Sequence, residues 1–128
     1  MKIENIFVVD LPIEDAWLVL LDIPAIVPCM PGAELLSVEA AHSYRGQVKV
    51  KLGPVSVAFQ GRAKFIEIDQ ANWTVRVKAS GVEMKGRGNA DADVSFRLTP
   101  AENGTRVDVI TDVNLAGAVA QYGRAQGV

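Results

Sequence analysis

A long alternation of apolar and polar residues between positions 33 and 115 limits the folds that are open to this chain. Val48, Val50 and Leu52, for example, alternate with a glutamine and two lysines. A repeat of two residues places the two sets of side chains on opposite faces of a β-strand. Strand after strand with one apolar and one polar face predicts an antiparallel sheet that is covered on one side only.

Turn signals divide this region into six strands. Gly53-Pro54 and Asn103-Gly104 mark turns between them, and Asn-Gly is a strong hairpin signal. The alternation changes phase at Ile66 and Ile68, which predicts a β-bulge near residue 65.

Helical signals flank the six strands. Residues 2–9 are rich in Ile, Phe and Val and predict a first strand. Pro12 stands at a first helical position, and apolar spacing predicts a helix over about 12–21, while Pro24 can open a second short helix. The Ala-rich segment 115–128 predicts the start of a last helix. The order β-αα-β6-α over residues 1–128 predicts a single α+β domain with a curved antiparallel sheet of about seven strands.

A strongly curved sheet and one terminal helix leave space between them, so we expect an apolar cavity there. The alternative is that the same apolar rows are ordinary core. The rings of Trp73 and Tyr122 can stack on a flat ligand while their polar ends bond a carbonyl group. The expected lining residues are Val50, Val57, Phe59, Trp73, Val75, Val77, Phe96 and Tyr122.

Basic residues concentrate in the middle of the chain. Residues 44–87 hold nine Lys and Arg but only three Asp and Glu, although the whole chain has a formal charge of −2. Six of these cations share the outward phase of three successive strands and predict a basic patch on the convex face: Lys49, Lys51, Arg62, Lys64, Arg76 and Lys78. Such a patch is either a solubilising surface or a docking site for anionic lipid headgroups or an acidic protein.

The residues that do chemistry in enzymes are sparse. A single cysteine, Cys29, and a single histidine, His42, exclude an internal disulfide, the usual zinc sites and a His-rich metal site. We expect Cys29 to act as a small hydrophobe and His42 to be an exposed turn residue. Thr111 is the main polar group of the inward rows, so we expect no catalytic residues and no bound metal.

Other patterns predict where this chain acts. The acidic balance, with a pI near 5.3, disfavours nucleic-acid binding. No segment is long and apolar enough for a transmembrane helix, and residues 1–10 lack a signal-peptide core. We therefore expect a cytoplasmic protein. Asp91 and Asp93 share the wet face of one strand and are expected to be solvated.

Several segments, in order and at their spacing, resemble the family of the carbon monoxide dehydrogenase G subunit, within the START-like or Bet v 1-like superfamily. The match runs nearly end to end. The segments include Phe7-Val8-Val9, Cys29-Met30-Pro31-Gly32-Ala33, Lys51-Leu52-Gly53-Pro54-Val55, Phe59-Gln60-Gly61, Gly86-Arg87-Gly88 and Gln121-Tyr122-Gly123-Arg124. The family's terminal helix runs well past the last segment, whereas this chain has four residues after Arg124, so we expect part of the lid over the cavity to be missing.

The resemblance implies a helix-grip fold and a non-catalytic partner of a molybdenum hydroxylase such as carbon monoxide dehydrogenase. It implies a hydrophobic ligand, a quinone or lipid held without a covalent bond, and recruitment of the enzyme to the inner membrane, where the protein would be peripheral. The alternative is a protein-docking module with a filled core and a basic convex face. A small-molecule cyclase or hydrolase is a third interpretation, because fold alone does not choose the function.

Overall fold

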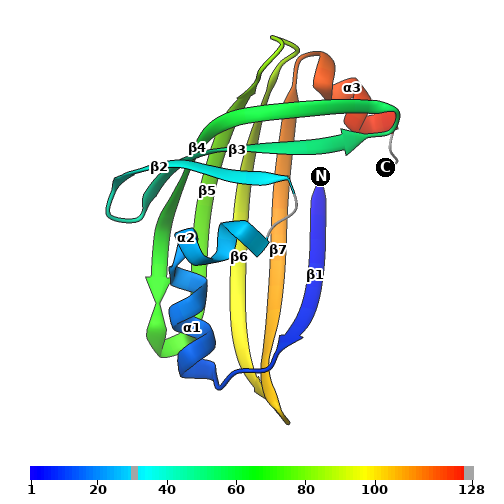
Figure 1. The fold of residues 1–128 in the computed structure, drawn as a ribbon. Coiled ribbons are helices and arrows are strands. Elements are labelled where there is room, and N and C mark those ends of the chain that lie inside the picture. Colours follow the sequence, from blue (N-terminus) through cyan, green and yellow to red (C-terminus); the bar gives the residue numbers. More distant parts are fainter. Residues whose placement is uncertain (30–31, 126–128) are drawn as a thin grey trace.

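The computed structural model describes residues 1–29 and 32–125 (Figure 1). The strands are β1 (Lys2–Val9), β2 (Ala33–Ala40), β3 (Ser43–Leu52), β4 (Val55–Asp69), β5 (Thr74–Glu83), β6 (Asn89–Ala101) and β7 (Gly104–Ala116). The helices are α1 (Ile13–Leu21), α2 (Ile23–Ile26) and α3 (Ala118–Ala125), with 3₁₀ turns η1 (Val27–Cys29) and η2 (Gln70–Asn72). The predicted order β-αα-β6-α is confirmed.

One antiparallel sheet contains all seven strands, in the order β1-β7-β6-β5-β4-β3-β2. The upper part of β4 bends over the other strands, so that β2, β3 and the first half of β4 cross in front of β5, β6 and β7 (Figure 1). Helices α1 and α2 lie against the inside of this curve. The curvature gives the sheet a concave inner face and a convex outer face, as the alternation predicts.

Irregular positions let the sheet bend. The pairing of β4 with β5 shifts between Phe65 and Glu67, which confirms the bulge predicted near residue 65. At Gly61 the neighbouring strand comes so close that an added Cβ would lie 1.8 Å from the carbonyl oxygen of Ser80. Any side chain at this position would therefore separate β4 from β5.

Trp73 lies between η2 and β5 and is not a strand residue, although it continues the apolar alternation of Val75 and Val77 in the sequence. The Asp69 carboxylate accepts a hydrogen bond from the Asn72 amide, and this contact closes the turn η2. Trp73 then adopts a left-handed conformation, with φ of 56°, and β5 begins one residue later. Its indole packs edge-on against Trp17 of α1, with the ring centroids 5.5 Å apart.

The hydrophobic core has two separate parts. The larger part, cluster A, lies between α1 and the sheet and consists of Ala16, Trp17, Phe65, Val75, Leu98 and Val107. The smaller part, cluster B, consists of Val57 and Phe59 of β4 and Val119 of α3. The two short helical regions therefore cover opposite ends of the concave face.

Candidate ligand-binding face

Seven of the eight residues expected to line a cavity lie on the concave face, and six of these divide between the two clusters. Val57 and Phe59 belong to cluster B, and Val57 is only 2% exposed. Val75 belongs to cluster A, with Trp73, Val77 and Phe96 packed against it. Val50 is exposed, and the side chain of Tyr122 lies outside the described part of the structure. Val57 and Val75 are buried as deeply as core residues.

Between the two clusters, the concave face of the sheet consists of small residues. One row across the sheet runs through Ala63, Ala79 and Ala92, and the next row through Gly61, Gly81 and Ala90. All six belong to the inward phase of their strands and are half-buried. A methyl group or a hydrogen atom at each position leaves the backbone of the sheet accessible to whatever covers this face.

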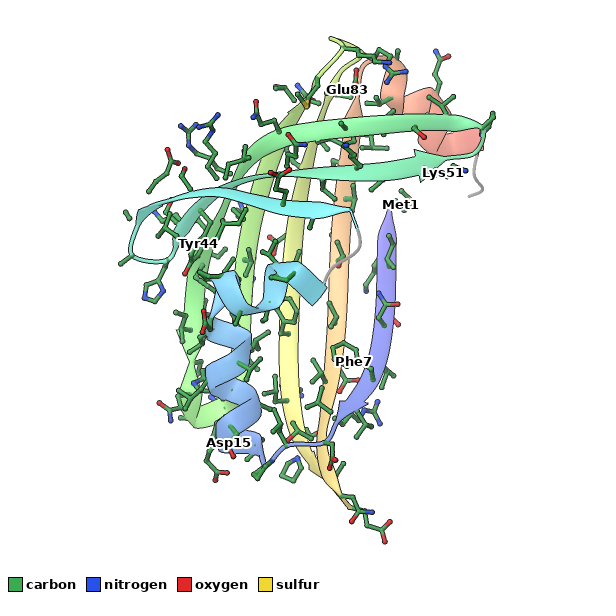
Figure 2. The ribbon with its side chains drawn as sticks, in the orientation of Figure 1. Met1, Phe7, Asp15, Tyr44, Lys51 and Glu83 are labelled. Atoms are coloured by element: carbon green, nitrogen blue, oxygen red, sulfur yellow. The ribbon has the colours of Figure 1, made fainter. Side chains whose placement is uncertain are left out.

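Large apolar side chains on the same face remain open to solvent. Ile3 and Phe7 of β1 point inward, as their register with Thr111 and Val107 requires, and yet they are 42% and 48% exposed. Figure 2 shows the position of Phe7 on β1. Val50 of β3 is 36% exposed. The described residues therefore present an uncovered apolar face between α1 and α3 rather than a closed cavity.

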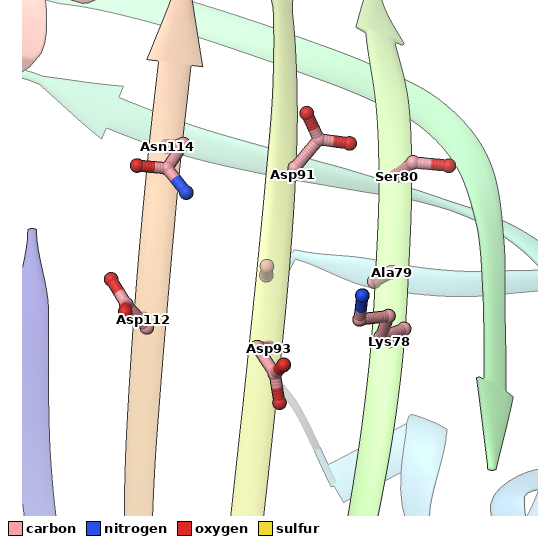
Figure 3. A pocket seen from close by; sticks show the side chains of 8 residues that line it. Lys78, Ala79, Ser80, Asp91, Asp93, Asp112 and Asn114 are labelled. Carbon is pink, nitrogen blue, oxygen red and sulfur yellow. The ribbon is translucent and has the colours of Figure 1, made fainter. Parts of the chain in front are cut away.

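The outer face carries a hollow that the sequence did not indicate. It has a volume of about 470 Å³ and opens over β5, β6 and β7 (Figure 3). Its lining side chains are mostly polar: Lys78, Ser80, Asp91, Asp93, Asp112 and Asn114. Asp91 and Asp93 thus face the outside of the sheet, as predicted, and Asp93 accepts a 2.9 Å hydrogen bond from Arg76.

All six predicted docking cations are exposed, and Lys64 pairs directly with Lys78 across β4 and β5. Arg62 and Arg76 lie two residues along these strands, whereas Lys49 and Lys51 lie farther away on β3. Arg62 is bound by the Glu39 carboxylate at 2.6 Å, and Arg76 contacts both Asp93 and Glu67. Lys51 lies near the tip of the β3–β4 hairpin (Figure 2). Arg62 pairs with Arg45, six residues before Lys51 on β3, so Lys51 and Arg62 are about 20 Å apart. Sequence periodicity gave the face of each residue but not its distance from the others.

A buried ion pair holds the end of the concave face near α3. The Glu83 side chain is 1% exposed and accepts hydrogen bonds from the Arg87 side chain and from the backbone amides of Lys85 and Arg87. Arg87 also donates to the Ser56 carbonyl, and its own carbonyl accepts from the Val119 amide. These bonds lower the pKa of Glu83 to about 2, with the Arg87 side chain as the main cause.

This ion pair was missed in the sequence, although a signal was present. Glu83 falls in the inward, apolar phase of β5 and precedes Arg87 by four residues. A charged residue in an apolar row indicates a buried partner. The pair ties three elements together, namely the β5–β6 loop, the β3–β4 hairpin and the start of α3.

The single histidine and the single cysteine lie at the two ends of the segment that contains β2. His42 is exposed in the turn between β2 and β3, as predicted, with a φ of 63° and an edge-on contact with Phe65. Cys29 ends η1, and its side chain is not among those described. Within residues 1–29 and 32–125 there is no group of three acidic, His or Cys side chains suited to a metal ion. No helix in this part of the chain is long and apolar enough to cross a membrane.

Solved structures with the same architecture define the fold class. A conserved protein from Geobacillus kaustophilus superposes with a TM-score of 0.81 at 17% identity, over 98% of this chain and 81% of that one. The Zhui aromatase/cyclase from a Streptomyces species gives 0.61 at 16% identity, over 92% and 70% of the two chains. A protein from Mycobacterium smegmatis gives 0.64 at 14% identity, over 98% and 80%. The chain has the Bet v 1-like helix-grip fold.

The family follows from the sequence itself. The family model of the carbon monoxide dehydrogenase G subunit (CoxG) matches residues 6–126, which is nearly the whole chain. This chain therefore belongs to the CoxG family, and the resemblance noted from its motifs is confirmed. No curated protein sequence is significantly similar to it.

Proposed function

We propose that this protein is a non-catalytic accessory subunit that binds a quinone or a lipid on its concave face and serves carbon monoxide dehydrogenase or a related molybdenum hydroxylase. The observation that carries the ligand proposal is the uncovered apolar face between clusters A and B. Its floor consists of alanine and glycine, and the apolar side chains around it remain partly exposed. A flat hydrophobic ring placed there removes apolar surface from water, which is favourable.

The family supports the second half of the proposal. Its name describes a subunit of carbon monoxide dehydrogenase, so the enzyme is the proposed partner. A quinone on the concave face would bring an electron acceptor of the respiratory chain to that enzyme. The exposed lysines of the outer face would then contact the anionic headgroups of the inner membrane, where each contributes about 1 kcal/mol.

The ligand proposal is tested by extraction and by titration. The protein, purified from a host that makes isoprenoid quinones, is extracted with organic solvent and examined by mass spectrometry, with the expected result of a bound quinone or lipid. Added quinone is then titrated while the fluorescence of Trp17 and Trp73 is followed, because both indoles border the concave face. If no quinone or lipid is extracted and the titration gives neither quenching nor a thermal shift, the proposal is wrong.

A pair of neighbouring variants locates the ligand. Ala79 faces inward and Ser80 faces outward on β5, so Ala79→Phe places a ring on the concave floor and Ser80→Phe places the same ring outside. We expect Ala79→Phe to weaken quinone binding at least tenfold and Ser80→Phe to leave it unchanged. Equal effects of the two variants on quinone binding would show that the ligand does not bind on the concave face.

The alternative is a protein-docking module that uses the basic residues alone. It is favoured by four exposed lysines that make no ion pair within the described residues: Lys49, Lys51, Lys64 and Lys78. A pull-down of the enzyme at low and high salt separates the two proposals, since screening weakens charge-based docking. Charge reversal at Lys49, Lys51, Arg76 and Lys78 should abolish capture, and unchanged capture would exclude the basic surface as the docking site.

An enzymatic role has little chemical support on the concave face. The polar side chains there include Thr111, which was expected, and Asn5, which pairs with Val109 on the neighbouring strand. Neither is an acid or a base at neutral pH, and the carboxylate of Glu83 is engaged with Arg87. The likeness to an aromatase/cyclase is one of fold, so we propose no reaction for this chain.

A further inference from the structure

Strand β1 is an open edge of the sheet. The strand order begins with β1 and ends with β2, so the curved sheet does not close into a barrel. All eight residues of β1 pair with β7 in one continuous register, from Lys2 with Asp112 to Val9 with Thr105. The other edge, β2, is interrupted by two register shifts. Bulges protect an edge against further pairing, and β1 has none.

Alternate residues of β1 have backbone groups that point away from the sheet. Met1 and Val113 exchange both of their backbone hydrogen bonds, each 2.7 Å long. In an antiparallel ladder such pairs recur at every second residue, so Ile3, Asn5 and Phe7 also bond to β7. The N–H and C=O groups of the even-numbered residues, Lys2 to Val8, are directed to the open side.

The side chains of this edge are apolar on both faces. Ile3 and Phe7 on the concave side are 42% and 48% exposed, and Ile6 and Val8 on the convex side are 61% and 62% exposed. The two charged residues, Lys2 and Glu4, contact each other at 3.7 Å, so the edge carries no net charge. A regular edge that is mostly apolar and has no net charge is a template for another strand.

The geometry points to a second copy of this chain as the partner: two β1 strands pair antiparallel about a two-fold axis at Asn5. In this register Phe7 of each chain stands opposite Ile3 of the other, which gives two apolar cross-strand pairs on the concave side. A register shifted by two residues toward the N-terminus would set Glu4 against Glu4, which is unfavourable. A shift the other way would lose both Ile3–Phe7 pairs.

The strand is short, and this limits the affinity. Stable interfaces use about 20–30 residues on each side, whereas β1 has eight. We therefore expect a reversible dimer with a dissociation constant on the order of 10–100 µM rather than a permanent one. Because the two-fold axis is perpendicular to the sheet, both concave faces open on the same side of the dimer. This inference is independent of the proposed ligand.

Sedimentation analysis between about 5 and 500 µM tests the dimer, in the range that a small interface implies. Ile6→Pro removes an N–H that points away from β7, so we expect the fold to persist and dimerisation to be lost. Ile6→Thr keeps the N–H and serves as the matched control, with dimerisation retained. A wild-type chain that stays monomeric throughout, or an Ile6→Pro variant that unfolds as the wild type does and still dimerises, would overturn the inference.

A cross-linking experiment tests the register without depending on proline. In a Cys29→Ser background, Asn5→Cys places two thiols across the axis, where Cα atoms of a non-hydrogen-bonded pair lie about 4.5 Å apart, within disulfide range. Lys2→Cys places them about 20 Å apart along the strands. We expect a covalent dimer under mild oxidation from the first variant alone. Cross-linking of both variants, or of neither, would contradict the proposed pairing.

Discussion

The division of the core into two clusters predicts that α3 can leave the sheet while the rest of the domain stays folded. Among the described side chains of α3, Val119 is fully buried and belongs to cluster B, where it packs on Val57 and Phe59. Leu98, 2% exposed, lies in cluster A at the other end of the concave face. Val119→Ala should therefore weaken the docking of α3 and leave cluster A unchanged.

The expected size of the effect follows from the atoms removed. Val119→Ala deletes two methyl groups, and burial of each contributes about 0.8 kcal/mol, so docking weakens by about 1.6 kcal/mol. Since about 1.4 kcal/mol corresponds to a factor of ten, the undocked population rises about 15-fold, and the remaining cavity raises this toward 100-fold.

Native-state hydrogen exchange measures both ends of the molecule at once. The Val119 amide donates to the Arg87 carbonyl at 2.9 Å, and the Leu98 amide donates to the Trp73 carbonyl at 3.0 Å. In Val119→Ala we expect the first amide to exchange about 15 to 100 times faster and the second to be unchanged. Leu98→Ala is the reciprocal control: it lowers global stability by about 2–5 kcal/mol and should accelerate the amide at position 98, whereas the Val119 amide, which exchanges through the local opening of α3, should change much less. Equal acceleration of the two amides in Val119→Ala would show that α3 opens only with the whole domain, and the two-cluster argument would be wrong.

Three further predictions concern stability. Gly61→Ala should lower the free energy of unfolding in urea by at least about 2 kcal/mol, because the new Cβ meets the Ser80 carbonyl. In the control Gly86→Ala the new Cβ meets no atom within 4 Å, so the loss should be only about 1 kcal/mol, for the positive φ. Similar losses in the two variants would refute the steric argument. The pKa of Glu83 is lowered in the folded chain from 4.5 to about 2, so its contribution is present above pH 4.5 and is lost as the pH falls toward 2. Thermal unfolding between these pH values should thus depend less on pH in Glu83→Gln than in the wild type, and parallel curves would contradict this. Thr105→Val removes the hydroxyl that donates to the Leu11 carbonyl at 2.8 Å, and calorimetry should show a loss of about 1–2 kcal/mol, while no loss would mean that water replaces the bond.

The candidate binding face was predicted only in part. The inward phase of the strands correctly placed Val57, Val75 and Val77 on one face, because side chains alternate with a period of two. The phase did not reveal that these residues belong to two clusters with a floor of small residues between them. It also gave no sign that Glu83, in the same phase, would be buried against Arg87.

Local signals along the chain are enough to establish the elements and their faces. Strand β1, the two short helices after it, the six-strand meander and the bulge near Phe65 all follow from periodicity, proline positions and turn residues, which act over a few neighbours. The depth of burial of each residue, in contrast, depends on the folded arrangement. Val50 and Val57 are directly paired, identical in type and on the same face, but one is 36% exposed and the other 2%. The difference depends on where the sheet bends and where α3 lies, which involves residues more than 60 positions away in the chain.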